Sequence, residues 1–155
     1  MNTNESDANQ TEDQGPQGSQ PGLHVVIVTG DRPVYDGLAE RVIAPATRGQ
    51  ITILAHHAPL LAALEPGELI VRGQQRDESL AVGAGFVEVR DDQVTILVDT
   101  AERAEEIDVA RAEAARRRAR ALMERYRGRP EYAAAWQALR RSRARLKVAR
   151  GMGRR

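Results

Sequence analysis

The sequence predicts an all-β N-terminal domain, a sandwich or flattened barrel, followed by a C-terminal α-helical hairpin. Three observations lead to this fold class. Residues 23 to about 99 form short runs rich in Val, Ile and Leu, separated by turn residues, with no helical pattern between them. From Ala101 onward Ala, Glu and Arg dominate, and all three favour helices. Gly128-Arg129-Pro130 then interrupts the helical stretch, so we expect two helices that fold back on each other.

The β part is divided by turn residues such as Thr29-Gly30-Asp31, Pro66-Gly67 and Asp91-Asp92. One uninterrupted strand is expected from Val34 to Ala44, where Pro45 follows. The predicted strands cover residues 23–28, 34–44, 49–54, 60–64, 69–72, 78–82, 86–90 and 93–98. Strands at this spacing suggest antiparallel pairing and a modest core of Val, Ile and Leu.

The helical part is predicted to begin at Asp108, a candidate N-cap, and to run to about Tyr126. A second helix is expected from about Glu131 to Ala149. The predicted apolar stripe comprises Ile107, Ala110, Ala114, Ala121 and Leu122, then Ala135, Trp136, Leu139 and Leu146. Much of this stripe is alanine, which buries little area at roughly 25 cal/mol per Å². The hairpin should therefore dock weakly on the β domain, which suits a conformational switch. A permanently folded hairpin with a small interface fits the pattern equally well.

Charge is divided unevenly along the chain. Residues 1–110 hold seven arginines and nineteen acids, a net charge of −12, whereas residues 111–155 hold sixteen basic residues and three acids, a net charge of +13. This asymmetry points to an acidic partner for the second half: nucleic acid, a membrane surface or an acidic protein face. The predicted organisation is a disordered polar tail at 1–22, the β-sandwich domain at 23–103, the two-helix domain at 104–150 and a basic tail at 151–155.

Several classes of site are disfavoured by the sequence. The chain has no cysteine, no secretory leader pattern and no apolar run of membrane-spanning length, so we expect a soluble or peripheral protein. His56-His57, followed by Pro59, favours a structural turn over a metal site. Gly83-Ala84-Gly85 favours a tight turn or bulge over dinucleotide binding, because no helical pattern follows it. No nucleophile elbow or phosphate loop is found, which argues against a stand-alone enzyme.

Arginines are the strongest chemical feature. They crowd both helices, at Arg116, Arg117, Arg118 and Arg120 and at Arg140, Arg141, Arg143 and Arg145. Like charges at these spacings repel, and a partner that supplies carboxylates or phosphates would relieve the repulsion. In an antiparallel hairpin Arg111, Arg141 and Arg145 can converge on one anion, with Asp108 accepting hydrogen bonds. The alternative is that Asp108 only caps the helix and pairs with Arg111.

The segment from Gly49 to Leu61, followed by Leu64-Glu65-Pro66-Gly67-Glu68-Leu69, resembles the epsilon subunit of F-type ATP synthases. The segments 85–89, 94–98, 101–102 and 139–146 are similar to that family as well. The resemblance covers about residues 23–150 and implies a flattened sandwich of about ten strands followed by two helices. It also implies that the sandwich contacts the gamma subunit and the membrane c-ring.

The resemblance further implies a non-catalytic rotor subunit that helps couple proton flow to ATP synthesis. In that family the helices lie folded on the sandwich or extend into the alpha/beta catalytic head, and the extended form inhibits ATP hydrolysis. Basic side chains of the helices face an acidic segment of the catalytic beta subunits. The expected location is the cytoplasmic side of the cell membrane, as a peripheral protein.

Some family members bind ATP in the folded hairpin, and their binding motif is matched here. The matching residues are Glu102, Ile107, Asp108, Arg111, Ala112, Arg141 and Arg145. ATP is therefore expected as a regulatory ligand, with no required cofactor, no catalytic residue and no metal ligand. The alternative is a nucleic-acid-binding module that uses the arginine-rich helices. Tyr126, Tyr132 and Trp136 are too few aromatics for a base-stacking platform, so no nucleic-acid partner is expected.

Overall fold

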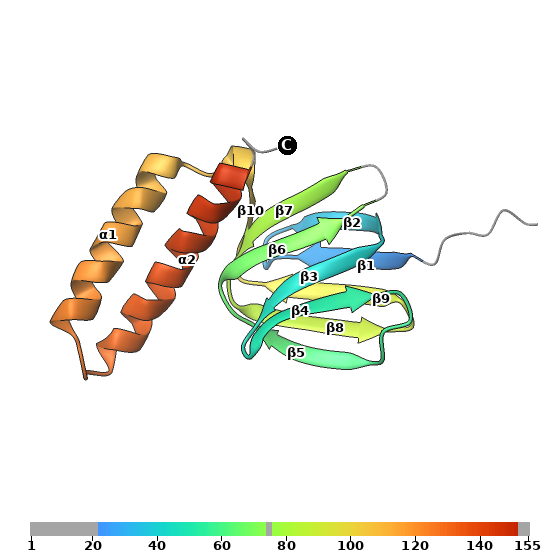
Figure 1. Cartoon of the computed structure of the whole chain (residues 1–155), viewed down its shortest axis with the longest axis horizontal. Helices are drawn as coiled ribbons and strands as arrows, with labels where there is room; N and C mark the ends of the chain where they lie inside the picture. The colour runs from blue at the N-terminus through green and yellow to red at the C-terminus, as the bar shows by residue number, and fades with distance from the viewer. Residues whose placement is uncertain (1–21, 74–75, 152–155) are drawn as a thin grey trace, which may run out of the picture.

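A computed structural model describes residues 22–73 and 76–151, and within them it contains ten strands followed by two long helices (Figure 1). The strands are β1 (Leu23–Val28), β2 (Pro33–Ala39), β3 (Arg41–Ala46), β4 (Gly49–Leu54), β5 (Leu60–Leu64), β6 (Gly67–Arg72), β7 (Asp77–Val82), β8 (Gly85–Arg90), β9 (Gln93–Val98) and β10 (Ala101–Arg103). The predicted fold class is therefore confirmed. The predicted tail of residues 1–22 lies outside the described residues except for Gly22, and so do residues 152–155 of the basic tail.

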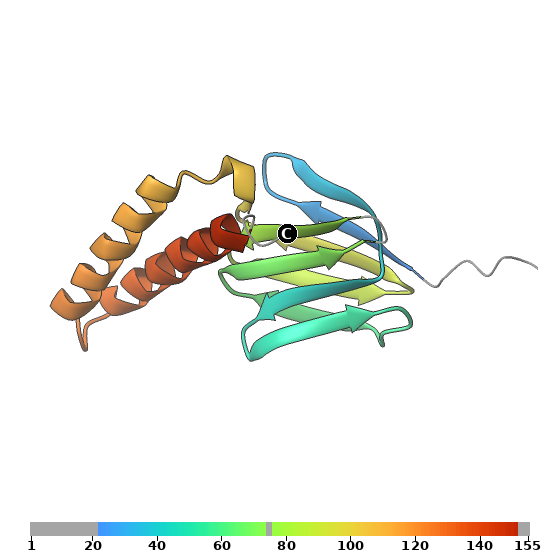
Figure 2. The ribbon, with the colours of Figure 1, turned by 45° about the horizontal axis from the view of Figure 1, so that its top comes forward.

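The strands form a two-layered sandwich (Figure 2). One layer runs β10-β7-β6-β3-β4 and the other runs β5-β8-β9-β1-β2, joined where Ala46 of β3 pairs with Leu64 of β5. The described pairs are antiparallel except for β1 and β9, which run parallel. Alternate side chains of each strand turn inward, so that Val25 and Ile27 of β1 and Val94 and Ile96 of β9 are fully buried. Each such burial contributes about 1.5–3 kcal/mol.

The strand predicted from Val34 to Ala44 is wrong, because the chain breaks there into β2 and β3. β2 pairs with β1 in one layer, whereas β3 pairs with β4 and β6 in the other. The bend falls at Glu40, whose backbone N–H donates to the carbonyl oxygen of Arg72 at 2.8 Å. Glu40-Arg41 is the only polar interruption at this point, and no glycine or proline marks a turn there, so the bend was not recognised from the sequence.

The helical hairpin has the predicted outline. A 3₁₀ turn, η1 (Ala104–Glu106), leads into α1 (Val109–Arg125), and α2 (Glu131–Gly151) follows after a short turn. Asp108 is the N-cap of α1, and its carboxylate accepts a hydrogen bond from the backbone N–H of Arg111 at 2.9 Å. Gly128 adopts a φ of 74° in the turn, a conformation that glycine tolerates without strain.

The apolar stripe predicted for the first helix is wrong at three of its five positions, whereas Ile107 is buried as predicted and Ala114 is half-buried. Ala110, Ala121 and Leu122 are exposed, whereas Ala112 and Ala119 are buried where α1 packs on α2. Alanine occurs on every face of α1, so the sequence left the direction of the buried face undetermined. In α2, Ala135, Leu139 and Leu146 are buried as predicted, and Trp136 is 40% exposed instead. Among the described residues, neither helix has the length and apolar character needed to cross a bilayer.

Candidate functional site at the junction of hairpin and sandwich

The hairpin docks on the sandwich through α2, which lies nearer to the strands than α1 does (Figures 1 and 2). α2 contacts β6 and β7, and the described apolar cluster at this contact contains four buried residues, Ala81, Ile107, Ala144 and Val148, with the half-buried Ala104 and Ala149 packed against them. Two of these four are alanines, so apolar burial alone holds the hairpin weakly. The small, alanine-rich apolar contact expected from the sequence is therefore present, and its strength stays a prediction.

Ion pairs supplement this small apolar contact. Arg145 of α2 pairs with Glu102 of β10 at 2.6 Å, and Lys147 pairs with Glu68 of β6 at 2.8 Å. Arg140 pairs with Glu65, which precedes β6. All three pairs join the cationic helix to the acidic domain, so the charge imbalance seen in the sequence acts across this interface. Docking therefore depends on charge as well as on burial.

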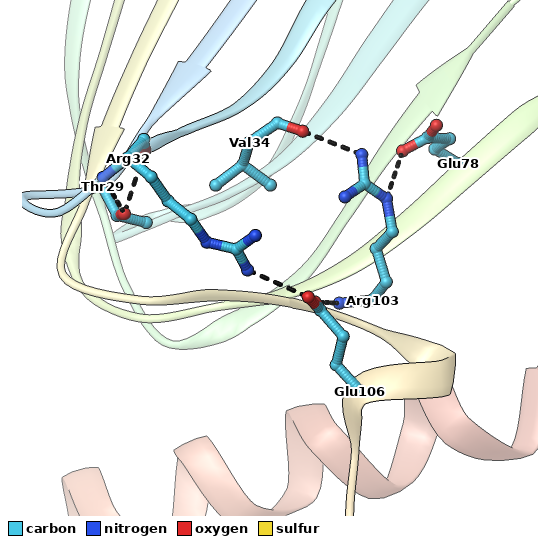
Figure 3. A network of polar contacts seen from close by, with 6 residues as sticks. All are labelled: Thr29, Arg32, Val34, Glu78, Arg103 and Glu106. Carbon is cyan, nitrogen blue, oxygen red and sulfur yellow. Dashed lines mark hydrogen bonds and ion pairs between the residues drawn. The ribbon is translucent and has the colours of Figure 1, made fainter.

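A second polar network fixes the chain where it leaves the sandwich (Figure 3). Glu106 of η1 accepts hydrogen bonds from the guanidinium of Arg32 at 2.9 Å and from the backbone N–H of Arg103 at 2.8 Å. These two donors, the Arg103 amide foremost, lower the pKa of the Glu106 carboxyl. The Arg103 guanidinium in turn donates to the Val34 carbonyl oxygen at 2.8 Å and pairs with Glu78 at 3.3 Å. η1 is thereby tied to β2, β7 and β10.

A cavity of about 460 Å³ lies where η1, α1, α2 and β10 meet. Its lining includes five of the seven predicted site residues: Glu102, Asp108, Arg111, Ala112 and Arg145. The other two lie elsewhere: Ile107 is buried in the docking cluster, and Arg141 is exposed on α2 outside the lining. The structure thus brings five of the seven predicted residues to one cavity and leaves Ile107 and Arg141 outside its lining.

Three lining residues were missed: Glu106, Ala115 and Arg118. Arg118 follows Arg111 by seven residues, which places the two on one face of a helix. That spacing was available in the sequence, but the adjacent Arg116 and Arg117 obscured it. Glu106 reaches the cavity because η1 turns the chain, and this turn had no evident sequence signal.

The cavity combines unpaired cations with hydrogen-bond acceptors. Within the described residues no carboxylate forms an ion pair with the guanidinium of Arg111 or Arg118, whereas Arg145 is held by Glu102. Asp108 contacts the backbone of Arg111 rather than its guanidinium, so the predicted cap is confirmed and the predicted pair is not formed. Two free guanidinium groups suit phosphate oxygens, and the carboxylates suit hydroxyl or amino donors. The arrangement is therefore chemically suited to a phosphorylated compound that also carries such donors.

The two turns considered in the sequence are confirmed. His56 adopts a φ of 62° after β4, and its backbone N–H donates to the Asp92 side chain at 2.6 Å. Gly83 and Gly85 flank the turn between β7 and β8. A Cβ atom on Gly85 would collide with the carbonyl oxygen of Leu97, so the close approach of two strands requires glycine there.

Comparison with known proteins gives the class of the chain. The family model for the beta-sandwich domain of the ATP synthase delta/epsilon chain matches residues 22–104, and the model for its long alpha-helix domain matches residues 105–150. These matches define a two-domain ATP synthase subunit. The chain belongs to the ATP synthase delta/epsilon chain family, as the resemblance seen in the sequence implied.

Its relatives include ATP synthase epsilon chains from several bacteria. The chain from Dehalococcoides mccartyi is 47% identical over 128 residues, which cover 82% of this chain and 91% of that one. The chain from Thermosynechococcus vestitus is 44% identical over 133 residues, which cover 84% of this chain and 96% of that one. A chain in the Euglena gracilis mitochondrial ATP synthase structure matches with a TM-score of 0.72 and 20% identity over 96% of this chain and 90% of that one, a likeness of fold.

Proposed function

We propose that this chain is a non-catalytic rotor subunit of ATP synthase, in which the sandwich contacts the gamma subunit and the membrane c-ring and the hairpin restrains ATP hydrolysis. As part of the rotor it helps couple proton flow to ATP synthesis, as a peripheral protein on the cytoplasmic side of the membrane. Family membership and the epsilon-chain relatives support this assignment. The Euglena gracilis structure of similar fold is titled as an OSCP/F1/c-ring assembly.

An exposed apolar surface on the sandwich supports the rotor contacts. Phe86 of β8 lies opposite Leu97 of β9 in the sheet register, and both side chains are more than half exposed. Leu61 on neighbouring β5 is 73% exposed. Large apolar side chains gathered on one face of a soluble protein commonly mark a protein contact. This face is the best candidate for the contact with the gamma subunit.

The observation that carries the regulatory proposal is the charged docking of the hairpin. A helix held by a small apolar cluster and three ion pairs can exchange its carboxylate partners for others at little cost. An acidic surface on the alpha/beta catalytic head would offer such partners. The Arg32–Glu106–Arg103 network holds η1 to the sandwich, so the hairpin would pivot after Glu106.

ATP is the proposed ligand of the cavity between α1, α2 and β10. Its phosphates would face Arg111 and Arg118, and its hydroxyl or amino groups would face the carboxylates. The cavity closes only while Arg145 stays beside Glu102, so a bound nucleotide would favour the docked hairpin.

A truncation designed on the structure tests the inhibitory role. A stop after Glu106 removes the hairpin but keeps β10 and η1, and therefore the pairing of β10 with β7. The assembled ATP synthase carrying this subunit should hydrolyse ATP faster than the enzyme with the full chain. Equal amounts of subunit bound per complex, measured by quantitative gel, serve as the control. An unchanged hydrolysis rate at equal occupancy would contradict the inhibitory role.

A further inference from the structure

A second and larger cleft lies on the other side of the hairpin. It has a volume of about 880 Å³ and is bounded by α1, α2 and the β3–β4 and β5–β6 turns. It shares no lining residue with the cavity around Arg111. At 3.6 residues per turn, Arg116 and Arg120 lie about half a turn around α1 from Arg111 and Arg118. The two hollows therefore flank the hairpin on opposite faces.

The lining of this cleft is strongly cationic. It contains six basic side chains: Arg116, Arg120, Arg140, Arg143, Lys147 and Arg150. Three carboxylates pair with four of them, because Glu113 holds both Arg116 and Arg150, Glu65 holds Arg140 and Glu68 holds Lys147. The six cations and the three carboxylates that pair with them therefore carry a net charge of +3.

Two of these cations are available to a ligand. Arg120 on α1 and Arg143 on α2 form no ion pair with any described residue, and they line the cleft from its two helical walls. The Nε atom of Arg116 is buried and has no hydrogen-bond partner among the described residues. Donors on both helical walls of one cleft that have no carboxylate partner suit an anionic ligand.

We propose that this cleft binds a polyphosphate chain, either inorganic or carried by a nucleotide. A chain of phosphates brings several negative charges and can bridge guanidinium groups on both helices, which a single phosphate cannot do as well. The volume lies within the range of small-ligand sites. Trp136 lines the same cleft with 40% of its surface exposed, so a nucleobase could stack on its indole ring.

Because the cleft is bounded by both the sandwich and the hairpin, its ligand would also hold them together. Pro66 and Gly67 form part of one wall and Arg143 and Trp136 part of the other. Displacement of the hairpin would take the arginines away from the sandwich wall. The bound polyphosphate is therefore expected to stabilise the docked hairpin by linkage.

Trp136 supplies a site-specific readout, because it is the only tryptophan in the chain. Titration of the full chain with tripolyphosphate should give a saturable change in its fluorescence. Arg120→Gln and Arg143→Gln should each weaken binding about tenfold, the effect of losing one charge-assisted hydrogen bond. Arg117→Gln is the matched control, since it removes the same charge from an exposed position of α1 outside the lining. Circular dichroism verifies that each variant keeps its helices.

Three further arms decide between the outcomes. ATP and GTP that bind more tightly than tripolyphosphate would assign the site to nucleotides, and equal binding would assign it to the phosphate chain alone. Arg111→Gln should leave the tripolyphosphate signal intact, which separates this cleft from the proposed ATP cavity. The proposal is overturned if the fluorescence does not saturate or if Arg117→Gln weakens binding as much as Arg120→Gln. Tighter binding of a polyglutamate peptide than of any polyphosphate would overturn it as well.

Discussion

Arg145 of α2 holds both carboxylate oxygens of Glu102 on β10, with its Nε atom 3.0 Å from each and its Nη2 atom 2.6 Å from one of them. Both side chains are about 30% exposed, so the pair is partly shielded from water. A bidentate pair of this kind fixes orientation as well as distance. It joins the last strand of the sandwich to the last turns of the hairpin, and it forms one wall of the proposed ATP cavity.

Glu102→Gln should shift the hairpin toward the open state. The change removes one charge of the pair and leaves Arg145 uncompensated, which should cost about 1 kcal/mol of docking, or a factor of about five in the ratio of docked to open forms. The chain has no cysteine, so Arg48→Cys and Leu122→Cys, both at exposed positions, can carry spin labels for distance measurement. Glu131→Gln, an equal charge change at the exposed start of α2, should leave the distance distribution unchanged.

Ionic strength should loosen the same interface in the wild-type chain. The Debye length falls from about 10 Å at 0.1 M to about 3 Å at 1 M salt, which weakens the Lys147–Glu68 pair, whose lysine side chain is 66% exposed, and to a smaller extent the Arg145–Glu102 pair. The spin-label distance should lengthen with added sodium chloride. A distance that stays constant up to 1 M salt would show that apolar burial dominates the docking.

Arg118→Gln should reduce the thermal stabilisation of the chain by ATP. A ligand at about 100 times its dissociation constant adds about 2.7 kcal/mol to stability, and loss of a phosphate contact lowers that increment at fixed ATP. Arg118 lines the cavity and Arg141 does not, so Arg118→Gln should have the larger effect. Differential scanning fluorimetry across an ATP series measures both. A larger effect of Arg141→Gln would mean that the arginine indicated by the family resemblance, and not the one indicated by the cavity lining, contacts the phosphates.

The sequence was sufficient to locate most strands and both helices, but not to predict which strands pair or which face of α1 is buried. β-branched runs between turn residues located most strands, and the break around Gly128 located the hairpin, because these depend on local conformational preference. The division at Glu40 depends on which strands pair across the sandwich, and the buried face of α1 depends on where α2 lies. Neither tertiary relationship is encoded in local spacing.

The candidate site shows the same limit. Asp108, Arg111 and Ala112 lie together on one helical turn, so their spacing was enough to group them. Glu102 and Arg145 meet across 43 residues, and only the family resemblance brought them together before the fold was known. Arg141 is one helical turn from Arg145 and still lies outside the lining. Sequence spacing predicts which side chains share a face of the helix, but it does not predict how far along the helix the cavity extends.

His24 should make the stability of the sandwich dependent on pH. Its ring lies on β1 between Gln93 of β9 and Asp36 of β2, at 2.8 Å from each, and both ring nitrogens can donate only when the imidazole is protonated. The bond to Gln93 first, and then the bond to Asp36, raise the pKa of His24 above 6.5. A raised pKa means that the folded state binds the proton more tightly than the unfolded state.

His24→Gln should therefore lower the melting temperature more at about pH 5 than at about pH 8. The stabilisation by His24 is present in full below the unfolded-state pKa and is lost as the pH rises through the folded-state pKa. The difference in melting temperature between wild type and variant, followed by circular dichroism across this range, measures the effect. His57→Gln is the control, because among the described residues the His57 ring bonds the adjacent Ala58 carbonyl oxygen and bridges no strands. If the difference in melting temperature grew with rising pH instead, the neutral form of His24 would be the stabilising one, and the prediction would be wrong.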